Sequence, residues 1–83
     1  MIRVQYFARY REQLGLEEEA LPWTPSLSSL GDLHRLLLKR GQQWTATLGE
    51  ANLMCARNQD LCSLEEPLQD GDEIAFFPTV TGG

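Results

Sequence analysis

The chain has 83 residues, a length that fits a single domain with a modest hydrophobic core. Its formal charge of −5 argues against a nucleic-acid backbone or an anionic membrane as the main partner, and it favours a partner that carries basic residues. No apolar run is long enough for a signal peptide or a membrane span, so we expect a cytoplasmic protein.

The beginning of the chain predicts two strands joined by a short helical turn. Residues 2–7 alternate as a half-buried strand does, with Phe7 on the face opposite Ile2, Val4 and Tyr6. One helical turn is expected over 10–14, closed by Gly15, and a second strand over 16–21. Within this strand the run 17–19, three glutamates, is expected to form a solvated edge rather than a metal site, because its like charges repel.

The main helix is predicted to follow the prolines at 22 and 25. Ser29 suits the N-cap, and Asp32 three residues later suits a capping box. Its apolar face is expected to comprise Leu30, Leu33 and Leu37, with Trp44 as a further candidate. Arg35, Lys39 and Arg40 are expected to point away. Gly41 is expected to end or interrupt the helix, and His34 to be a boundary residue rather than a catalyst.

The second half predicts further strands and turns. A strand is expected over 53–57, a turn over 58–60 and a short return over 61–64. Asp70-Gly71-Asp72 is a turn signal, and the strand Glu73–Phe77 follows it, with Ile74 and Phe76 on one face and Ala75 and Phe77 on the other. One amphipathic helix packed across this mixed sheet predicts an α+β fold of the β-grasp type.

The C-terminus predicts a tail distinct from the domain. Pro78 has no N–H and so weakens further strand pairing. Residues 79–83 have too little apolar surface to offset the entropy of ordering them, which divides the chain into a domain over 1–78 and a flexible reactive tail over 79–83. Gly82 and Gly83 lack side chains, so the tail fits a narrow slot, and the reactive group it delivers is a carboxylate that must first be activated.

Motifs for independent catalysis are missing from the sequence. It contains no phosphate-binding loop, no HExxH and no GxSxG, so an enzymatic role has to come from the tail or from a partner. Cys55 and Cys62 have neither zinc-site nor CxxC spacing, and we expect buried, reduced thiols. A redox protein built on these two cysteines is the least favoured alternative.

Three segments carry a family resemblance. The run PLQDGDEIAFFPTVTGG at 67–83, the run FARYRE at 7–12 followed by Gly15, and the pair Asn58-Gln59 resemble the MoaD branch of the MoaD/ThiS ubiquitin-like sulfur carriers. That branch comprises the small subunits of molybdopterin synthases. The resemblance covers nearly the whole chain and is dense at its two ends.

The resemblance implies a β-grasp fold and a defined chemistry. An ATP-dependent activating enzyme would adenylate the Gly83 carboxylate, and sulfur would then replace an oxygen to give a thiocarboxylate. The tail would enter the large synthase subunit, in a heterotetramer, and donate sulfur to cyclic pyranopterin monophosphate to build the molybdopterin dithiolene. No permanently bound cofactor or metal, no nucleic acid and no membrane are expected.

The expected site follows from this resemblance and from strand alternation. Gly82 and Gly83 form its reactive end. The expected partner-binding residues are Phe7, Arg11, Leu61, Phe77, Pro78, Thr79, Val80 and Thr81. If the larger apolar sets face the helix, Phe7 and Phe77 lie together on the solvent side of the sheet; the alternative is that both rings belong to the core.

Two residues depart from the family pattern, and two further functions stay open. Thr79 replaces a common proline, which is expected to loosen the tail slightly, and Arg57 replaces an apolar strand residue, which leaves the local packing in question. One alternative is a sulfur carrier for thiamine-thiazole or tRNA thiolation. The other is a ubiquitin-like protein modifier without sulfur chemistry.

Overall fold

The sheet order places the first strand and the last strand side by side in the middle of the sheet. The computed structural model describes residues 1–79. Its elements are β1 (Ile2–Tyr6), α1 (Ala8–Leu14), β2 (Glu18–Leu21), α2 (Leu30–Leu38), α3 (Gln42–Leu48), β3 (Met54–Arg57), β4 (Asp60–Cys62) and β5 (Glu73–Phe77). The five strands lie in the order β2-β1-β5-β3-β4, with β1 and β5 parallel and the other pairs antiparallel.

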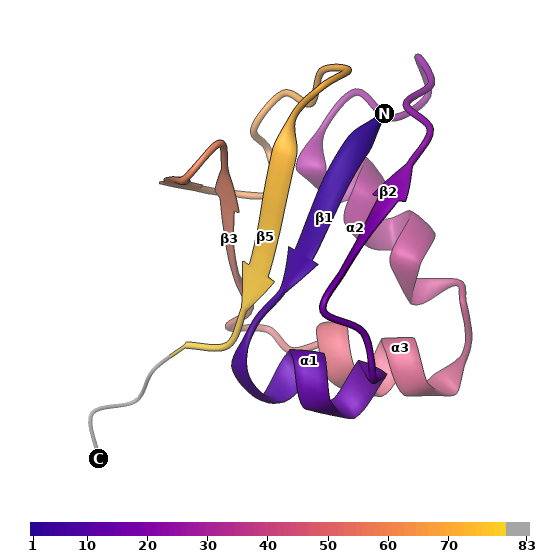
Figure 1. Ribbon diagram of the computed structural model, residues 1–83, viewed down its shortest axis with the longest axis vertical. Helices are drawn as coiled ribbons and strands as arrows, with labels where there is room; N and C mark the ends of the chain where they lie inside the picture. The colour runs from indigo at the N-terminus through magenta and orange to yellow at the C-terminus, as the bar shows by residue number, and fades with distance from the viewer. Residues whose placement is uncertain (80–83) are drawn as a thin grey trace.

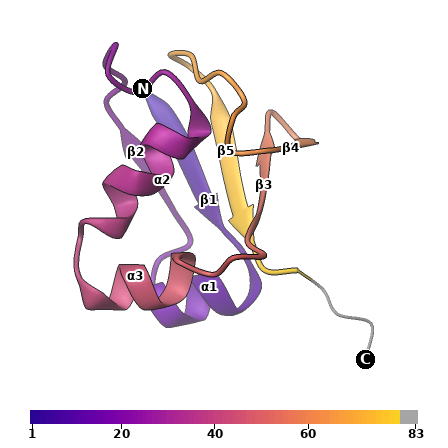
Figure 2. The ribbon, with the colours of Figure 1, turned by 180° about the vertical axis from the view of Figure 1, so that it is seen from behind.

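One face of the sheet is covered and the other is open. α2 crosses behind the sheet in Figure 1 and in front of it in Figure 2, while α1 and α3 lie at the end where β1 and β5 finish. This arrangement of a main helix across a mixed sheet confirms the expected β-grasp fold. Within residues 1–79, no helix is long and apolar enough to cross a membrane.

The core forms on the covered face, where strand alternation predicted it. Val4 pairs with Ile74 and Tyr6 with Phe76 in the parallel register, and all four side chains are fully buried. The alternations predicted for 2–7 and 73–77 are therefore confirmed over β1 and β5. Burying such side chains stabilises the fold by about 1.5–3 kcal/mol each.

α2 begins at the predicted capping box. The Ser29 hydroxyl accepts a hydrogen bond from the Asp32 N–H, and the Asp32 carboxylate accepts one from the Ser29 N–H, both at 3.2 Å. Its buried side chains include the expected Leu30, Leu33 and Leu37. His34 is the expected boundary residue, because its half-buried ring contacts the Leu48 carbonyl through Nε2 at 2.7 Å.

A helix that the sequence did not predict follows α2. Gly41, at φ 134°, separates α2 from α3, so it interrupts the helical region rather than only ending it. Trp44 belongs to α3 and not to the face of α2. Other boundaries shift slightly: α1 starts at Ala8, β2 at Glu18 and β3 at Met54, and the return strand covers 60–62 rather than 61–64.

The edge strand β2 is held by a cluster around Glu19 rather than only solvated. Its carboxylate accepts a hydrogen bond from the Tyr6 hydroxyl at 2.7 Å and two from the Arg40 guanidinium, at 2.7 and 2.9 Å. Arg40 also lies over the Trp44 ring, 4.6 Å from its centroid. Glu17 and Glu18 are exposed on this edge, as expected, whereas Glu19 departs from the expectation because it is half-buried and paired; its partner Arg40 is exposed but lies outside α2.

Candidate functional site

The tail starts at the end of β5. The last strand residue is Phe77, and Pro78 after it is buried. The Thr79 hydroxyl donates a hydrogen bond to the Asn52 carbonyl, in the loop before β3. The substitution expected to loosen the tail therefore also provides a contact that proline could not make. The expected site residues Val80, Thr81, Gly82 and Gly83 lie outside the described residues.

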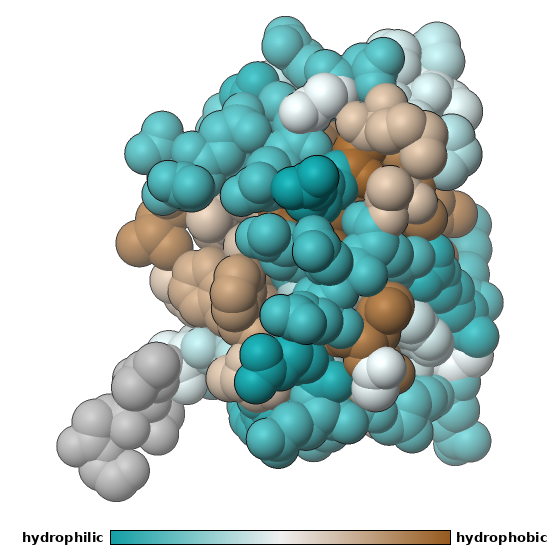
Figure 3. All heavy atoms as spheres, viewed as in Figure 1, coloured by the Kyte–Doolittle hydropathy of each residue, from teal (hydrophilic) through white to brown (hydrophobic). Residues whose placement is uncertain are grey.

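An apolar patch lies beside this starting point on the open face of the sheet. We define the outer-face patch as Phe7, Met54, Leu61 and Phe77. Phe7 is 44% exposed and Leu61 68%, whereas Met54 and Phe77 are half-buried. In Figure 3, apolar atoms gather over β3 and β5, near the end of the described chain.

Strand register explains the patch. Met54 pairs with Phe77, next to the buried pair Cys55 and Phe76, so the Met54–Phe77 pair faces the other side of the sheet. Leu61 pairs with Ala56 and has the same outward direction. The sequence-based placement of Phe7 and Phe77 outside the core is confirmed, and Met54 is a member that it missed.

Phe7 remains on this face because the backbone turns sharply after it. Its N–H donates to the Phe76 carbonyl at 3.2 Å, which continues the β1–β5 pairing by one residue. Phe7 is extended, at φ −120° and ψ 159°, and Ala8 then adopts φ 54°, in the left-handed region. The chain therefore enters α1 at once, with the Phe7 ring 44% exposed at the junction.

α1 is tied to the loop that carries Asn52. Arg9 donates two hydrogen bonds to the Glu50 carboxylate, at 2.6 and 2.9 Å, and the Tyr10 hydroxyl donates a third at 2.7 Å. These bonds, led by those from Arg9, hold the pKa of Glu50 below its usual value. Arg11, an expected partner-binding residue, is exposed, and it forms no ion pair within residues 1–79. A basic side chain is thus available on the α1 side.

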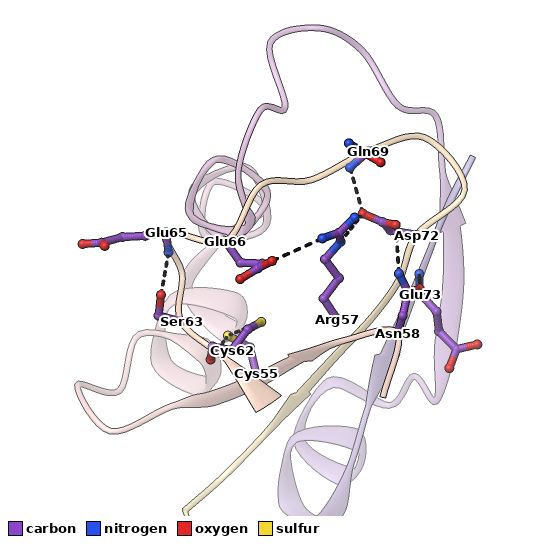
Figure 4. Close-up of polar contacts among 10 residues, drawn as sticks. All are labelled: Cys55, Arg57, Asn58, Cys62, Ser63, Glu65, Glu66, Gln69, Asp72 and Glu73. Carbon is purple, nitrogen blue, oxygen red and sulfur yellow. Dashed lines mark hydrogen bonds and ion pairs between the residues drawn. The ribbon is translucent and has the colours of Figure 1, made fainter. Parts of the chain in front are cut away.

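The opposite end of β3 and β5 is fixed by a polar cluster around Asp72 (Figure 4). Arg57 donates from Nε to the Asp72 carboxylate at 2.8 Å and from Nη1 to Glu66 at 3.2 Å. The Asn58 amide donates to Asp72 at 3.1 Å, and the Gln69 N–H at 2.8 Å. Arg57 is therefore paired with two carboxylates, which answers the packing question raised by its departure from the family pattern.

The two cysteines lie opposite each other on β3 and β4. Both are free thiols; Cys55 is buried as expected, whereas Cys62 is only half-buried. Groups of three or more side chains suited to a metal ion are absent among residues 1–79. A shallow pocket of about 310 Å³ lies at the starts of β1 and β5, away from the tail, and so is not part of this site.

The missed contacts share one cause. Glu50, Asn52 and Met54 each contact a residue that is distant in sequence. Glu50 binds Arg9 at a separation of 41 residues, and Asn52 binds Thr79 at a separation of 27. No local spacing or propensity signal carries such pairings. The outward position of Met54 is the exception. Strand alternation would have predicted it if the pairing of Met54 with Phe77 had been known.

Solved structures with this fold cover almost the whole chain. SAMP1 from Haloferax volcanii matches with a TM-score of 0.78 and 25% identity, over 99% of this chain and 98% of that one. A chain of the protein–protein complex of subunits 1 and 2 of the molybdopterin-converting factor from Helicobacter pylori matches with a TM-score of 0.68 and 28% identity, over 99% of this chain and 97% of that one.

Sequence relatives match over their full length. The molybdopterin synthase sulfur carrier subunits of Escherichia coli and Haemophilus influenzae are 39% and 37% identical to this chain, over all 83 residues and the whole of each relative. The ThiS family model matches residues 4–83. The chain therefore belongs to the ThiS family.

Proposed function

We propose that this protein is the sulfur carrier subunit of a molybdopterin synthase. The observation that carries the proposal is the full-length relationship to two proteins of that name. The fold supports it, because β5 and the buried Pro78 lead directly to a segment that closes with Gly82 and Gly83. A segment without bulky side chains suits delivery of a reactive carboxylate into a narrow enzyme site.

In the proposed chemistry the domain positions the tail and partners supply the catalysis. An ATP-dependent activating enzyme transfers AMP to the Gly83 carboxylate, which makes the acyl carbon susceptible to attack. Sulfur then displaces AMP and leaves a thiocarboxylate. This group is the nucleophile that donates sulfur to cyclic pyranopterin monophosphate. The carrier needs no permanently bound cofactor for this role, since its covalent state holds the sulfur.

The proposed main partner is the large subunit of the synthase, in a heterotetramer. The solved Helicobacter pylori neighbour is a complex of subunits 1 and 2, which supports a carrier that works in a two-subunit assembly. The outer-face patch includes Phe77, at the root of the tail, where such a subunit, and separately the activating enzyme, has to bind. Arg11 is a further exposed candidate on α1.

Deletion of Gly83 tests this function. Loss of the terminal residue should abolish sulfur transfer and leave the melting temperature unchanged, because Gly83 lies outside the proposed domain over 1–78. Intact mass after incubation with activating enzyme, ATP and a sulfur source should show oxygen-for-sulfur exchange in the wild type alone. A graded pair gives the control: Gly82→Ala should retain more transfer than Gly82→Leu. Molybdopterin formation by the Gly83 deletion would overturn the mechanism.

A protein-modifier function is the second candidate, favoured by the match to SAMP1, the small archaeal modifier protein 1. It requires lysine-linked conjugates and no thiocarboxylate, so mass analysis of the same reactions separates the two. Carriers for thiamine-thiazole or tRNA thiolation share the thiocarboxylate, and the biosynthetic defect that the gene rescues distinguishes them from the proposed function.

A further inference from the structure

Cys55 and Cys62 are held opposite each other by the β3–β4 hairpin. They are register partners, and their sulfur atoms lie 4.0 Å apart. The Cys55 thiol donates to the Cys62 carbonyl at 3.3 Å, and Figure 4 shows both side chains on the same side of the hairpin. Both sulfurs are free thiols.

The turn prevents this pairing from slipping. Asn58 and Gln59 adopt φ 50° and 73°, as a two-residue hairpin turn with the favoured twist requires. Arg57, beside the turn, is anchored to Asp72 and Glu66, which fixes β3 to the strand beyond it. The two thiols therefore face each other in the folded hairpin, and the hairpin does not have to open for them to meet.

This geometry is close to that of a disulfide. Directly opposed residues of antiparallel strands have Cα atoms about 4.5–5.5 Å apart, within the range that a disulfide bridges. Closing the contact to a bond of about 2.05 Å requires side-chain rotation rather than movement of the strands. We propose that Cys55 and Cys62 form a reversible dithiol site that reacts with low-molecular-weight disulfides and staples β4 to β3.

The reaction proceeds by two thiol–disulfide exchanges. The Cys62 thiolate, the more accessible of the two, attacks one sulfur of the small disulfide, breaks its S–S bond and releases one thiol. Cys55, after loss of its proton, then attacks the Cys62 sulfur and expels the second thiol. The protein loses two electrons and two protons, and the small disulfide gains them as two thiols.

Burial of Cys55 slows this reaction, and the edge position of β4 determines its structural effect. Burial, with Cys62 nearby, raises the pKa of the Cys55 thiol to about 12, so closure is slow at neutral pH. β4 is a three-residue edge strand that pairs with β3 alone, so a bond at Cys62 adds a covalent tie to a weakly held strand. Leu61 faces away from the sulfurs and stays exposed in either state.

Titration of the full-length folded protein with oxidised and reduced glutathione at about pH 9, where a larger fraction of each thiol is ionised than at neutral pH, tests the site. Intact mass should show loss of two hydrogen atoms without a glutathione adduct, in monomeric protein. The melting temperature should rise by about 10 °C or more, and amide exchange in β4 should slow. Cys55→Ala and Cys62→Ala are the matched controls; each keeps one thiol and cannot close.

Three results would overturn the proposal. A glutathione adduct that persists at Cys62 would show that Cys55 cannot reach it. A disulfide-linked dimer would show that the thiols pair between chains. Oxidation in urea but not in the folded protein would show that the hairpin holds the thiols apart. None of these readouts involves sulfur transfer, so they are independent of the proposed function.

Discussion

Asp72 is a buried carboxylate whose charge is stabilised by several donors. Burial alone would raise its pKa, but hydrogen bonds from Arg57, the Gln69 N–H and the Asn58 amide hold the pKa below its usual value. A group with a lowered folded-state pKa adds stability above its unfolded pKa of about 3.9, and that stability is lost as the pH falls through the folded value. The cluster is therefore a source of acid sensitivity.

Replacing the arginine of this cluster should destabilise the domain measurably. Arg57→Leu removes a charged donor from Asp72, and we expect the free energy of unfolding at neutral pH to fall by about 1–3 kcal/mol. The matched control is Arg35→Leu, which removes an exposed ion pair with Asp32 and should change it by less than about 0.5 kcal/mol. Urea titrations of both variants measure the difference.

The same cluster gives an acid-dependence test. Between about pH 5 and pH 2, the wild type should lose more stability than Asp72→Asn, because only the wild type has this carboxylate to protonate. Urea titrations at several pH values compare the two slopes. Parallel curves for the two proteins would mean that Asp72 adds no pH-dependent stability.

At the scale of the elements, β2 is held by long-range polar contacts as well as by its pairing with β1. It is an edge strand of four residues, and the Glu19 carboxylate links it to Tyr6 on β1 and to Arg40 after α2. Burial opposes the Glu19 charge, but hydrogen bonds from Arg40 and Tyr6 lower its pKa. Burial, followed by the hydrogen bond to Glu19, raises the pKa of Tyr6, so its hydroxyl remains a donor at neutral pH.

Two glutamates of this strand region provide a matched comparison. Glu19→Gln should lower the free energy of unfolding by about 1–2 kcal/mol, because the amide cannot accept from Tyr6 and from both nitrogens of Arg40 as the carboxylate does. Glu17→Gln, at an exposed position, should change it by less than about 0.5 kcal/mol. Equal effects of Glu19→Gln and Glu17→Gln in chemical denaturation would mean that Glu19 behaves as the solvated edge residue expected from the sequence.

Local signals predicted the elements that depend on local physics. Alternation gave β1 and β5, and Ser29 with Asp32 gave the start of α2. The helix α3 was missed because its sequence, QQWTATL, contains few apolar residues and follows a glycine. The partners of Glu19 lie 13 and 21 residues away, beyond the reach of any local pattern.

In the candidate site, too, the features set by local pattern were predicted and the long-range contacts were not. Phe7 and Phe77 were placed correctly because alternation fixes the face of a strand residue and the β-grasp order makes their strands neighbours. The anchoring of Thr79 to Asn52 was not, because a hydrogen bond between loops across 27 residues has no sequence signal.

At the scale of the whole molecule, the parallel pairing of β1 with β5 brings the first strand beside the root of the tail. The outer-face patch therefore combines residues from both ends of the chain with Met54 and Leu61 from the hairpin. A partner that covers this patch is positioned to take the tail at the same time. Exposed apolar residues in such a location are more consistent with docking than with packing.

Alanine substitutions should separate docking from stability. We expect Phe7→Ala and Leu61→Ala to weaken binding to the two proposed partners, the large subunit and the activating enzyme, by roughly tenfold or more. The melting temperature should change little, because both side chains are already exposed. Phe77→Ala should weaken binding similarly but also lower stability, since this ring is half-buried. Calorimetric titrations beside thermal melts give both quantities.

Leu36→Ala is the control for this comparison. Leu36 on α2 is 43% exposed, nearly the same as Phe7 at 44%, but it lies on the helix rather than on the open face of the sheet. Its truncation removes a similar kind of exposed apolar surface, so binding should remain at the wild-type level if location decides docking. Equal weakening by Leu36→Ala and Phe7→Ala would indicate nonspecific apolar adhesion. Unchanged binding in a folded Phe7→Ala or Leu61→Ala protein would exclude that residue from the interface.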